Sequence, residues 1–184
     1  METLIPTEQL NFLCISNHEN DLHWLEDFEN PYVIYDRSDN NRSCESFEYI
    51  KSPNLGYNIY DMLSFIIDNY DNLPEVTTFI KGNTFPRHVT KEVFLALMNS
   101  KTYTPIFEPS LHSTQLPVSM FSSDGLFSEL NNSWYASNSK YFNNYNTFTS
   151  YCFEDSVVPQ YVTFCPGANY VVPKDYILKY SKNF

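Results

Sequence analysis

Basic residues are scarce in this sequence, which has 11 Lys and Arg against 22 Asp and Glu and a formal net charge of −11. A protein that binds nucleic acid needs clustered Lys and Arg to neutralise phosphates, and the few basic residues here are spread along the chain. The same imbalance argues against binding to an anionic membrane surface. We therefore expect no nucleic-acid partner, whereas a single bound nucleotide needs only a few well-placed donors.

Long apolar runs, a basic leader and closely spaced cysteines are also missing. No apolar run approaches the roughly 20 residues of a membrane span. Residues 1–10 contain two glutamates and no Lys or Arg, unlike a secretory leader. Wide, irregular gaps separate the four cysteines, which are Cys14, Cys44, Cys152 and Cys165. We interpret them as reduced structural residues and expect a cytoplasmic protein.

Glycine is rare as well, with only four residues in 184, whereas hydrophobic residues make up 42% of the chain and aromatic residues 17%. A chain of this length buries roughly 70% of its unfolded surface on folding. We therefore expect one folded domain over residues 1–184. Each glycine marks either an ordinary turn or a close approach of the backbone to another group.

Three short apolar runs, over residues 12–16, 32–35 and 76–80, predict buried strands. A short helix is expected over 22–28, and a longer helix, capped by Asn58, precedes the third strand. Its apolar residues share one face at offsets of three and four: Ile59, Leu63, Ile66, Ile67 and Tyr70. Met62 and Phe65 widen that face, so we expect deep burial. A strand, a helix and a strand that follow one another in this way predict a right-handed βαβ crossover.

The second half of the sequence is less regular. Thr90 caps a predicted helix that carries Val93, Phe94, Leu97 and Met98. Residues 101–151 are rich in Asn, Ser and Tyr, and we expect a long, irregular segment over the active edge of the sheet. A strand pair over 161–164 and 169–172 and a terminal helix over 173–179 follow. The predicted fold class is α/β, with a mostly parallel sheet and flanking helices.

Polar clusters follow the three predicted core strands, over residues 17–20, 36–39 and 81–83. In a parallel sheet, ligands bind beyond these carboxyl ends. Residues 54–58 open the long helix, where free N–H groups favour a phosphate. Arg37, Lys81 and Arg87 can supply positive charge. The arrangement suits a nucleotide-linked substrate, and the alternative is that these are solvated loop ends.

Motifs for other chemistries are missing: there is no HExxH, no Cys/His cluster, no P-loop and no G-x-S-x-G. His88 is a candidate catalytic acid or ligand, or else a structural hydrogen-bonding residue. Glu154 and Asp155 precede the last strand pair, and either carboxylate could take the proton of an acceptor hydroxyl. The alternative is a solvated acidic loop.

Several segments together resemble a family of uncharacterised small glycosyltransferase-like proteins. The shared patterns are N-x-G at Asn54–Gly56 and Y-x-x-L-P at the end of the long helix, and residues 79–82, followed by His88, are similar to the family's F-x-Q-G with Lys81 in place of Gln. Residues 166–172 are similar to the family's P-G-A-x-F-x-V, and residues 17–25 to its E-D-x-x-W-L. The matches span about residues 12–179, with the middle third unmatched.

The resemblance implies the nucleotide-sugar-binding half of a GT-A-type, Rossmann-like fold. It makes Asp36 a nucleoside contact, places Asn54 and Gly56 at the phosphate, and leaves Gly167 and Asn169 beside the acceptor or sugar. The remaining residues that we expect to bind the donor lie near the strand ends and the helix start: Arg37, Asn58, Lys81, Gly82 and Asn83. The expected partners are a nucleotide sugar and a glycan or protein acceptor.

Many such transferases hold Mn²⁺ or Mg²⁺ with an Asp-x-Asp pair, which this chain does not contain. Lys81 stands where the family has Gln, and its charge could replace that of a metal. We expect a small glycosyltransferase that transfers a sugar from a nucleotide sugar. The alternative is a non-catalytic binding or assembly module that retains the fold, to which the Tyr- and Asn-rich middle segment also points.

Overall fold

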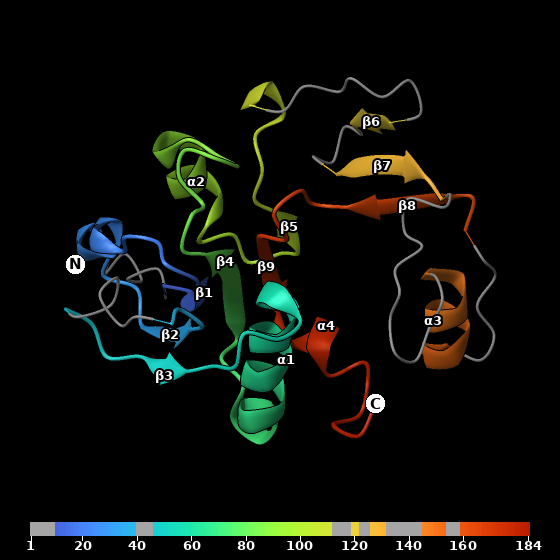
Figure 1. The fold of residues 1–184 in the computed structure, drawn as a ribbon, viewed down its shortest axis with the longest axis horizontal. Coiled ribbons are helices and arrows are strands. Elements are labelled where there is room, and N and C mark those ends of the chain that lie inside the picture. The colour runs from blue at the N-terminus through green and yellow to red at the C-terminus, as the bar shows by residue number, and fades with distance from the viewer. Residues whose placement is uncertain (1–9, 40–45, 112–118, 122–125, 132–144, 154–158) are drawn as a thin grey trace, which may run out of the picture.

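A six-stranded sheet forms the centre of the computed structural model, which describes residues 10–39, 46–111, 119–121, 126–131, 145–153 and 159–184 (Figure 1). The strand order is β3-β2-β1-β4-β9-β5. The strands are β1 (Phe12–Asn17), β2 (Tyr32–Asp36), β3 (Ile50–Lys51), β4 (Val76–Lys81), β5 (Thr104–Pro105) and β9 (Tyr170–Pro173).

The first four strands of this sheet run parallel. β1 pairs with β2 on one side and with β4 on the other, while β9 is antiparallel to β4. Asn17 is paired with Asp36, and Ser16 with Lys81, so the carboxyl ends of β1, β2 and β4 meet at one edge. The predicted class, a mixed α/β fold with a mostly parallel, Rossmann-like sheet, is confirmed.

Side chains of the parallel strands alternate between two buried layers, as strand geometry requires. Leu13 and Ile15 face η1 (His23–Asp27) and α2 (Lys91–Leu97). Cys14 and Phe79 face the opposite layer, where α1 (Tyr57–Asn69) and α4 (Lys174–Ile177) lie. The helices thus cover both faces of the sheet, which explains why the core strands are apolar throughout.

The helix capped by Thr90 forms as the sequence predicts. Thr90 Oγ1 accepts a hydrogen bond from the backbone N–H of Val93 at 3.4 Å. Phe94 is fully buried and packs edge-on against Phe28 and Phe85. The segment predicted as a helix over 22–28 is instead the short 3-10 helix η1, and α4 ends at Ile177 rather than Lys179.

The predicted burial of the long helix α1 is wrong for part of its apolar face, although Phe65 is buried and Met62 and Ile66 pack against the core as expected. Ile59, Leu63 and Ile67 are 52, 50 and 48% exposed, whereas its buried residues are Asn58, Asp61 and Phe65. The carboxylate of Asp61 is hydrogen-bonded inside the protein, and this turns the more apolar stripe outward.

The start of α1 also differs from the prediction. Gly56, with a left-handed φ of 63°, is the N-cap residue, so Asn58 lies within the first turn and not at the cap. Only glycine adopts this conformation without strain. The helix continues into the 3-10 turn η3 (Tyr70–Asn72). No helix among the described residues is long and apolar enough to cross a membrane.

A second sheet occupies part of the segment that was predicted to be irregular. It has the antiparallel order β6-β7-β8, with β6 (Ser119–Phe121), β7 (Phe127–Leu130) and β8 (Tyr161–Phe164). The predicted pairing of 161–164 with 169–172 is therefore wrong, because β8 pairs with β7 and β9 pairs with β4. The strand partners lie far apart in sequence, so no local pattern marks them.

The described parts of 101–151 also include the 3-10 turn η4 (Pro109–Leu111) and the helix α3 (Tyr145–Cys152). Figure 1 shows the second sheet and α3 on the side of β5 and β9, away from β2 and β3. The expected cover over the carboxyl ends of the core strands is therefore not formed by the described residues of this segment.

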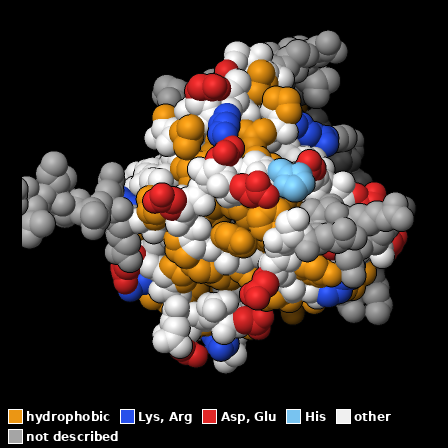
Figure 2. All heavy atoms as spheres, turned by 90° about the vertical axis from the view of Figure 1, so that its left-hand side faces the viewer, with side chains coloured by type: hydrophobic (Ala, Val, Ile, Leu, Met, Phe, Trp, Pro, Cys, Tyr) orange, Lys and Arg blue, Asp and Glu red, His pale blue; other side chains and the backbone are white. Residues whose placement is uncertain are grey.

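The opposite side of the molecule is the β3 edge of the main sheet. Figure 2 shows an apolar area there with acidic side chains around it. A shallow cavity of about 390 Å³ is lined partly by Tyr32, Tyr49 and Ile50. β3 has only two residues, and such a short edge strand offers few free backbone groups for pairing with another chain.

Two truncations on α1 test its orientation. Phe65→Ala removes a ring that packs on Phe12 and Phe79, and we expect the free energy of unfolding to fall by about 3–5 kcal/mol. Leu63→Ala, on the exposed side, should cost less than about 1 kcal/mol. Urea unfolding of both variants gives the comparison, and a larger loss for Leu63→Ala would show that the sequence-based face was right.

Candidate functional site

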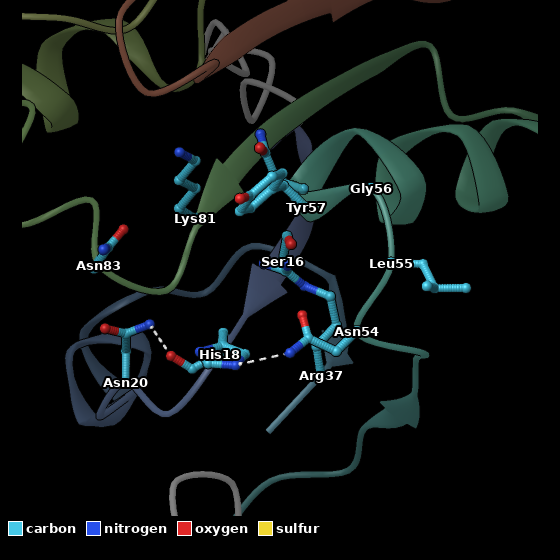
Figure 3. A pocket seen from close by; sticks show the side chains of 11 residues that line it. Ser16, His18, Asn20, Arg37, Asn54, Leu55, Gly56, Tyr57, Lys81 and Asn83 are labelled. Atoms are coloured by element: carbon cyan, nitrogen blue, oxygen red, sulfur yellow. Dashed lines mark hydrogen bonds between the residues drawn. The ribbon is translucent and has the colours of Figure 1, made fainter. Parts of the chain in front are cut away.

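A cavity of about 570 Å³ opens at the carboxyl ends of β1, β2 and β4 (Figure 3). Ser16, His18 and Asn20 line it from the end of β1 and the loop that follows. Arg37 comes from the end of β2, and Lys81 and Asn83 from the end of β4. The remaining wall is residues 54–58, at the start of α1.

Six of the eight residues expected to bind a donor line this cavity: Arg37, Asn54, Gly56, Asn58, Lys81 and Asn83. Asp36 and Gly82 do not line it. The grouping follows from the parallel sheet, which brings the strand ends and the start of the following helix to one edge.

A buried carboxylate, Asp61 of α1, lies behind the cavity. The Ser16 hydroxyl donates to its Oδ2, and the Ser52 hydroxyl donates to its Oδ1 at 2.5 Å. Arg37 Nε lies 3.1 Å from Oδ2. Asp61 is fully buried and Arg37 is only 8% exposed. Through these three contacts, Asp61 of α1 holds the end of β1, the residue after β2 and the residue after β3.

The electrostatics of Asp61 are a balance of opposing effects. Burial raises the pKa of its carboxyl, while the hydrogen bonds from Ser16 and Ser52 and the charge of Arg37 lower it. A buried carboxylate without these partners would be strongly destabilising. The same contacts hold the Arg37 guanidinium in one position at the cavity wall.

Asp36, the expected nucleoside contact, is also fully buried. Its Oδ1 accepts hydrogen bonds from Asn17 Nδ2 at 3.2 Å and from Ser38 Oγ at 2.6 Å. Lys51 Nζ lies 3.9 Å from Oδ2. Through these contacts the Asp36 carboxylate links the ends of β1, β2 and β3.

Gly82 is required by a close contact. A Cβ at this position would lie 2.1 Å from Asn17 Oδ1. The backbone N–H of Gly82 donates to the Ser16 carbonyl, and its own carbonyl accepts from Trp24 Nε1 at 3.1 Å. Gly82 therefore lets the end of β4 lie close to the end of β1.

Lys81 projects from the end of β4 and is half-buried. Its ammonium forms no ion pair with any residue in the described part of the chain. Burial, followed by repulsion from Arg87 and Arg37, lowers the pKa of Lys81. A negatively charged ligand would relieve this repulsion.

The start of α1 adds backbone donors to the same cavity. Gly56 caps this 13-residue helix without a side-chain hydrogen bond to the first turn. The first N–H groups of such a helix are unpaired within it and carry partial positive charge. Asn54 Nδ2 lies 3.3 Å from His18 Nε2. This contact holds the turn that precedes α1 beside the end of β1 (Figure 3).

The residues expected near the acceptor or sugar lie behind the end of β4 rather than in the cavity wall. Asn169 is fully buried, and its Oδ1 accepts from the Lys81 backbone N–H at 3.1 Å. Gly167 has a φ of 89°, and a Cβ there would lie 2.8 Å from the ring of buried His88. Glu154 and Asp155 lie outside the described residues.

No group of three or more His, Cys, Asp or Glu side chains that could hold a metal is found among the described residues. Among the described residues, no Asp or Glu lines the cavity. The expected Mn²⁺ or Mg²⁺ therefore stays a prediction from the resemblance alone.

Residues 13–184 match the model of DUF3431, a protein family of unknown function. The chain belongs to DUF3431. No curated protein matches the sequence. The DUF3431 description states no activity, so the glycosyltransferase resemblance and the roles of the individual residues stay predictions.

The most important residues of this DUF3431 site that sequence reasoning missed are Ser16, Ser52 and Asp61. Ser16 ends an apolar run and Ser52 begins a turn, so neither differs from an ordinary loop residue in sequence. Asp61 did give a signal, because it is a carboxylate one turn into a helix that was expected to be deeply buried. A charge in such a place needs buried partners.

Removing one donor to Asp61 tests this network. Ser52→Ala leaves a buried carboxylate oxygen without its hydrogen bond, and we expect the free energy of unfolding at neutral pH to fall by about 1–3 kcal/mol. Ser64→Ala, an equal change on α1, is the control and should have little effect. Urea unfolding measures both.

The pH dependence gives an independent check. The raised pKa of Asp61 means that stability falls as pH rises above the ordinary value of 3.8 and through the folded-state pKa. Ser52 stabilises the ionised form, so its loss raises this pKa further. The cost of Ser52→Ala should therefore be larger at neutral pH than near 3.8, and an equal cost at both would refute the ionised network.

Proposed function

We propose that this DUF3431 protein is a small GT-A-like glycosyltransferase that binds a nucleotide sugar at the carboxyl ends of β1, β2 and β4. The observation that carries the proposal is the cavity of about 570 Å³ there, with Arg37 and Lys81 in its wall. Its volume falls within the range of small-molecule sites in proteins.

The charge of the cavity supports an anionic ligand. The protein as a whole has a formal net charge of −11, yet the described residues that line the cavity include two cationic side chains and no carboxylate. The first turn of α1 adds N–H groups that favour phosphate. A nucleoside diphosphate combines compact negative charge with a base and ribose that fill the rest of such a cavity.

On this proposal the turn at Asn54 and Gly56 contacts the phosphates, and Lys81 and Asn83 lie beside the sugar–diphosphate bond. Asp36 positions the strand ends next to the nucleoside. In an inverting transfer, the acceptor hydroxyl oxygen bonds to the anomeric carbon as the bond to the diphosphate breaks. The hydroxyl proton passes to a carboxylate, for which Glu154 and Asp155 are the candidates.

On this proposal His88 is a candidate catalytic acid, Gly167 and Asn169 support the sugar or acceptor side from behind the end of β4, and the acceptor is a glycan or a protein. The proposed compartment is the cytoplasm, which rests on the cysteine pattern. Burial raises the pKa of the Cys165 thiol to about 12. Cys165 is thus a structural residue and not a nucleophile.

The alternative of a non-catalytic binding module has one observation in its favour. Ile59, Leu63 and Ile67 form an exposed apolar stripe along α1, and such stripes mark interaction surfaces in many proteins. A module of this kind would use α1 to bind a partner and would turn over no donor.

A thermal-shift panel tests the donor proposal. We expect UDP, GDP or ADP, or a corresponding sugar nucleotide, to raise the melting temperature. At ten times its Kd a ligand stabilises by about 1.4 kcal/mol, which is about 3–6 °C for a chain of this length. The matching nucleosides, which lack the phosphates, are the controls and should give much smaller shifts.

Turnover of a sugar nucleotide distinguishes a glycosyltransferase from a non-catalytic binding module. Release of free nucleotide from a sugar nucleotide, followed by enzyme-coupled detection, should occur with the protein and not without it. If no member of the panel shifts the melting temperature and none is hydrolysed, while light scattering shows a stable oligomer, the transferase proposal fails and the binding module is favoured.

A further inference from the structure

The cavity carries an uncompensated positive charge. Lys81 has no ion pair among the described residues, and Arg37 has one, through Nε to Asp61. The acidic residues that give the protein its negative charge gather elsewhere, for example on the face shown in Figure 2. A ligand that binds here must therefore bring the counter-charge itself.

Two buried carboxylates near the cavity, Asp61 and Asp36, already accept hydrogen bonds from other residues of the protein. Asp61 is fully buried and receives hydrogen bonds from Ser16 and Ser52 on its two oxygens. Asp36 is fully buried and accepts from Asn17 and Ser38. Mg²⁺ and Mn²⁺ are bound through accessible carboxylate oxygens, and the described part of the cavity wall offers none.

The Arg37 guanidinium and the backbone at Lys81 are held in position before any ligand arrives. The Lys81 backbone N–H donates to the buried Asn169 side chain at 3.1 Å, which fixes the end of β4. The Arg37 guanidinium is fixed by Asp61 at 3.1 Å. A guanidinium fixed in this way loses little conformational freedom when it binds phosphate oxygens.

We propose that Lys81 and Arg37 bind the donor diphosphate directly, so that this protein holds it without a divalent metal. Lys81 supplies a point charge and Arg37 a planar guanidinium, which suit phosphate oxygens in complementary ways. The inference deepens the proposed function and rests on it, because the diphosphate is that of the nucleotide sugar.

Calorimetric titration with inorganic pyrophosphate and with UDP tests the metal requirement. Each titration is run in EDTA and again with MgCl₂ in excess. We expect binding in EDTA, with a Kd within about threefold of that measured with Mg²⁺. Binding that appears only with Mg²⁺ would overturn the inference.

Lys81→Gln tests the residue itself. This substitution removes the charge and places there the amide that the similar family carries. We expect the Kd for pyrophosphate in EDTA to rise about tenfold to a hundredfold, the effect of losing a charged hydrogen bond. Circular dichroism and the urea midpoint should show an unchanged fold, because the Lys81 side chain makes no ion pair among the described residues.

Arg87→Gln is the matched control. Arg87 is close enough to lower the pKa of Lys81, but it does not line the cavity. Its removal should change the Kd by less than about threefold. An equal loss in both variants would mean that only the general electrostatic field matters, and no loss in Lys81→Gln would mean that Lys81 does not bind the anion; either result would refute the direct contact.

The outcomes for the inference and for the proposed function are separable. If pyrophosphate binds in EDTA through Lys81 while no nucleotide or sugar nucleotide binds, the metal-free anion site stands and the nucleotide-sugar function fails. If UDP binds and a sugar nucleotide is turned over, but only with Mg²⁺, the function stands and the inference fails.

Discussion

The carboxylate of Asp61 holds the functional edge of this protein together. It accepts the Ser16 hydroxyl at the end of β1 and the Ser52 hydroxyl after β3, and it pairs with Arg37 after β2. Because the charge is fully buried, it is tolerated only when these partners are present. The rotation of α1 about its axis, the position of its first turn at the cavity, and the direction of Arg37 all depend on this one side chain.

The strands of the core and the grouping of polar residues at their ends were predictable, because apolar runs mark parallel strands and a parallel sheet collects their carboxyl ends. Arg37, Asn54 and Lys81 meet in one cavity for that reason. The orientation of α1 was not predictable from hydrophobic spacing. The apolar stripe through Leu63 competes with the buried partners of Asp61, and the polar contacts prevail. The pairing of Phe127 with Phe164 was hidden by its sequence separation.

The glycines of the motif segments have structural explanations that need no ligand. Gly82 makes room for Asn17, and Gly167 makes room for His88. Asn169, from the same turn as Gly167, binds the backbone of Lys81. Segments that lie far apart in the sequence therefore support the end of β4 from two sides. At these positions the family pattern is explained by support of the strand end that carries Lys81, and on our proposal the ligand contacts come from the residues that face the cavity.

Net charge and local charge act on different ligands here. A formal charge of −11 repels a long polyanion over most of its length, because a nucleic acid extends well beyond the cavity and meets the acidic surface. The diphosphate of the proposed donor is small enough to lie within the cavity, where on our proposal Arg37 and Lys81 contact it directly and are only partly screened by water and salt. On this proposal the acidity of the chain disfavours nucleic acid, and the affinity for a single compact anion depends on Arg37, whose guanidinium Asp61 holds, and on Lys81, whose backbone Asn169 holds.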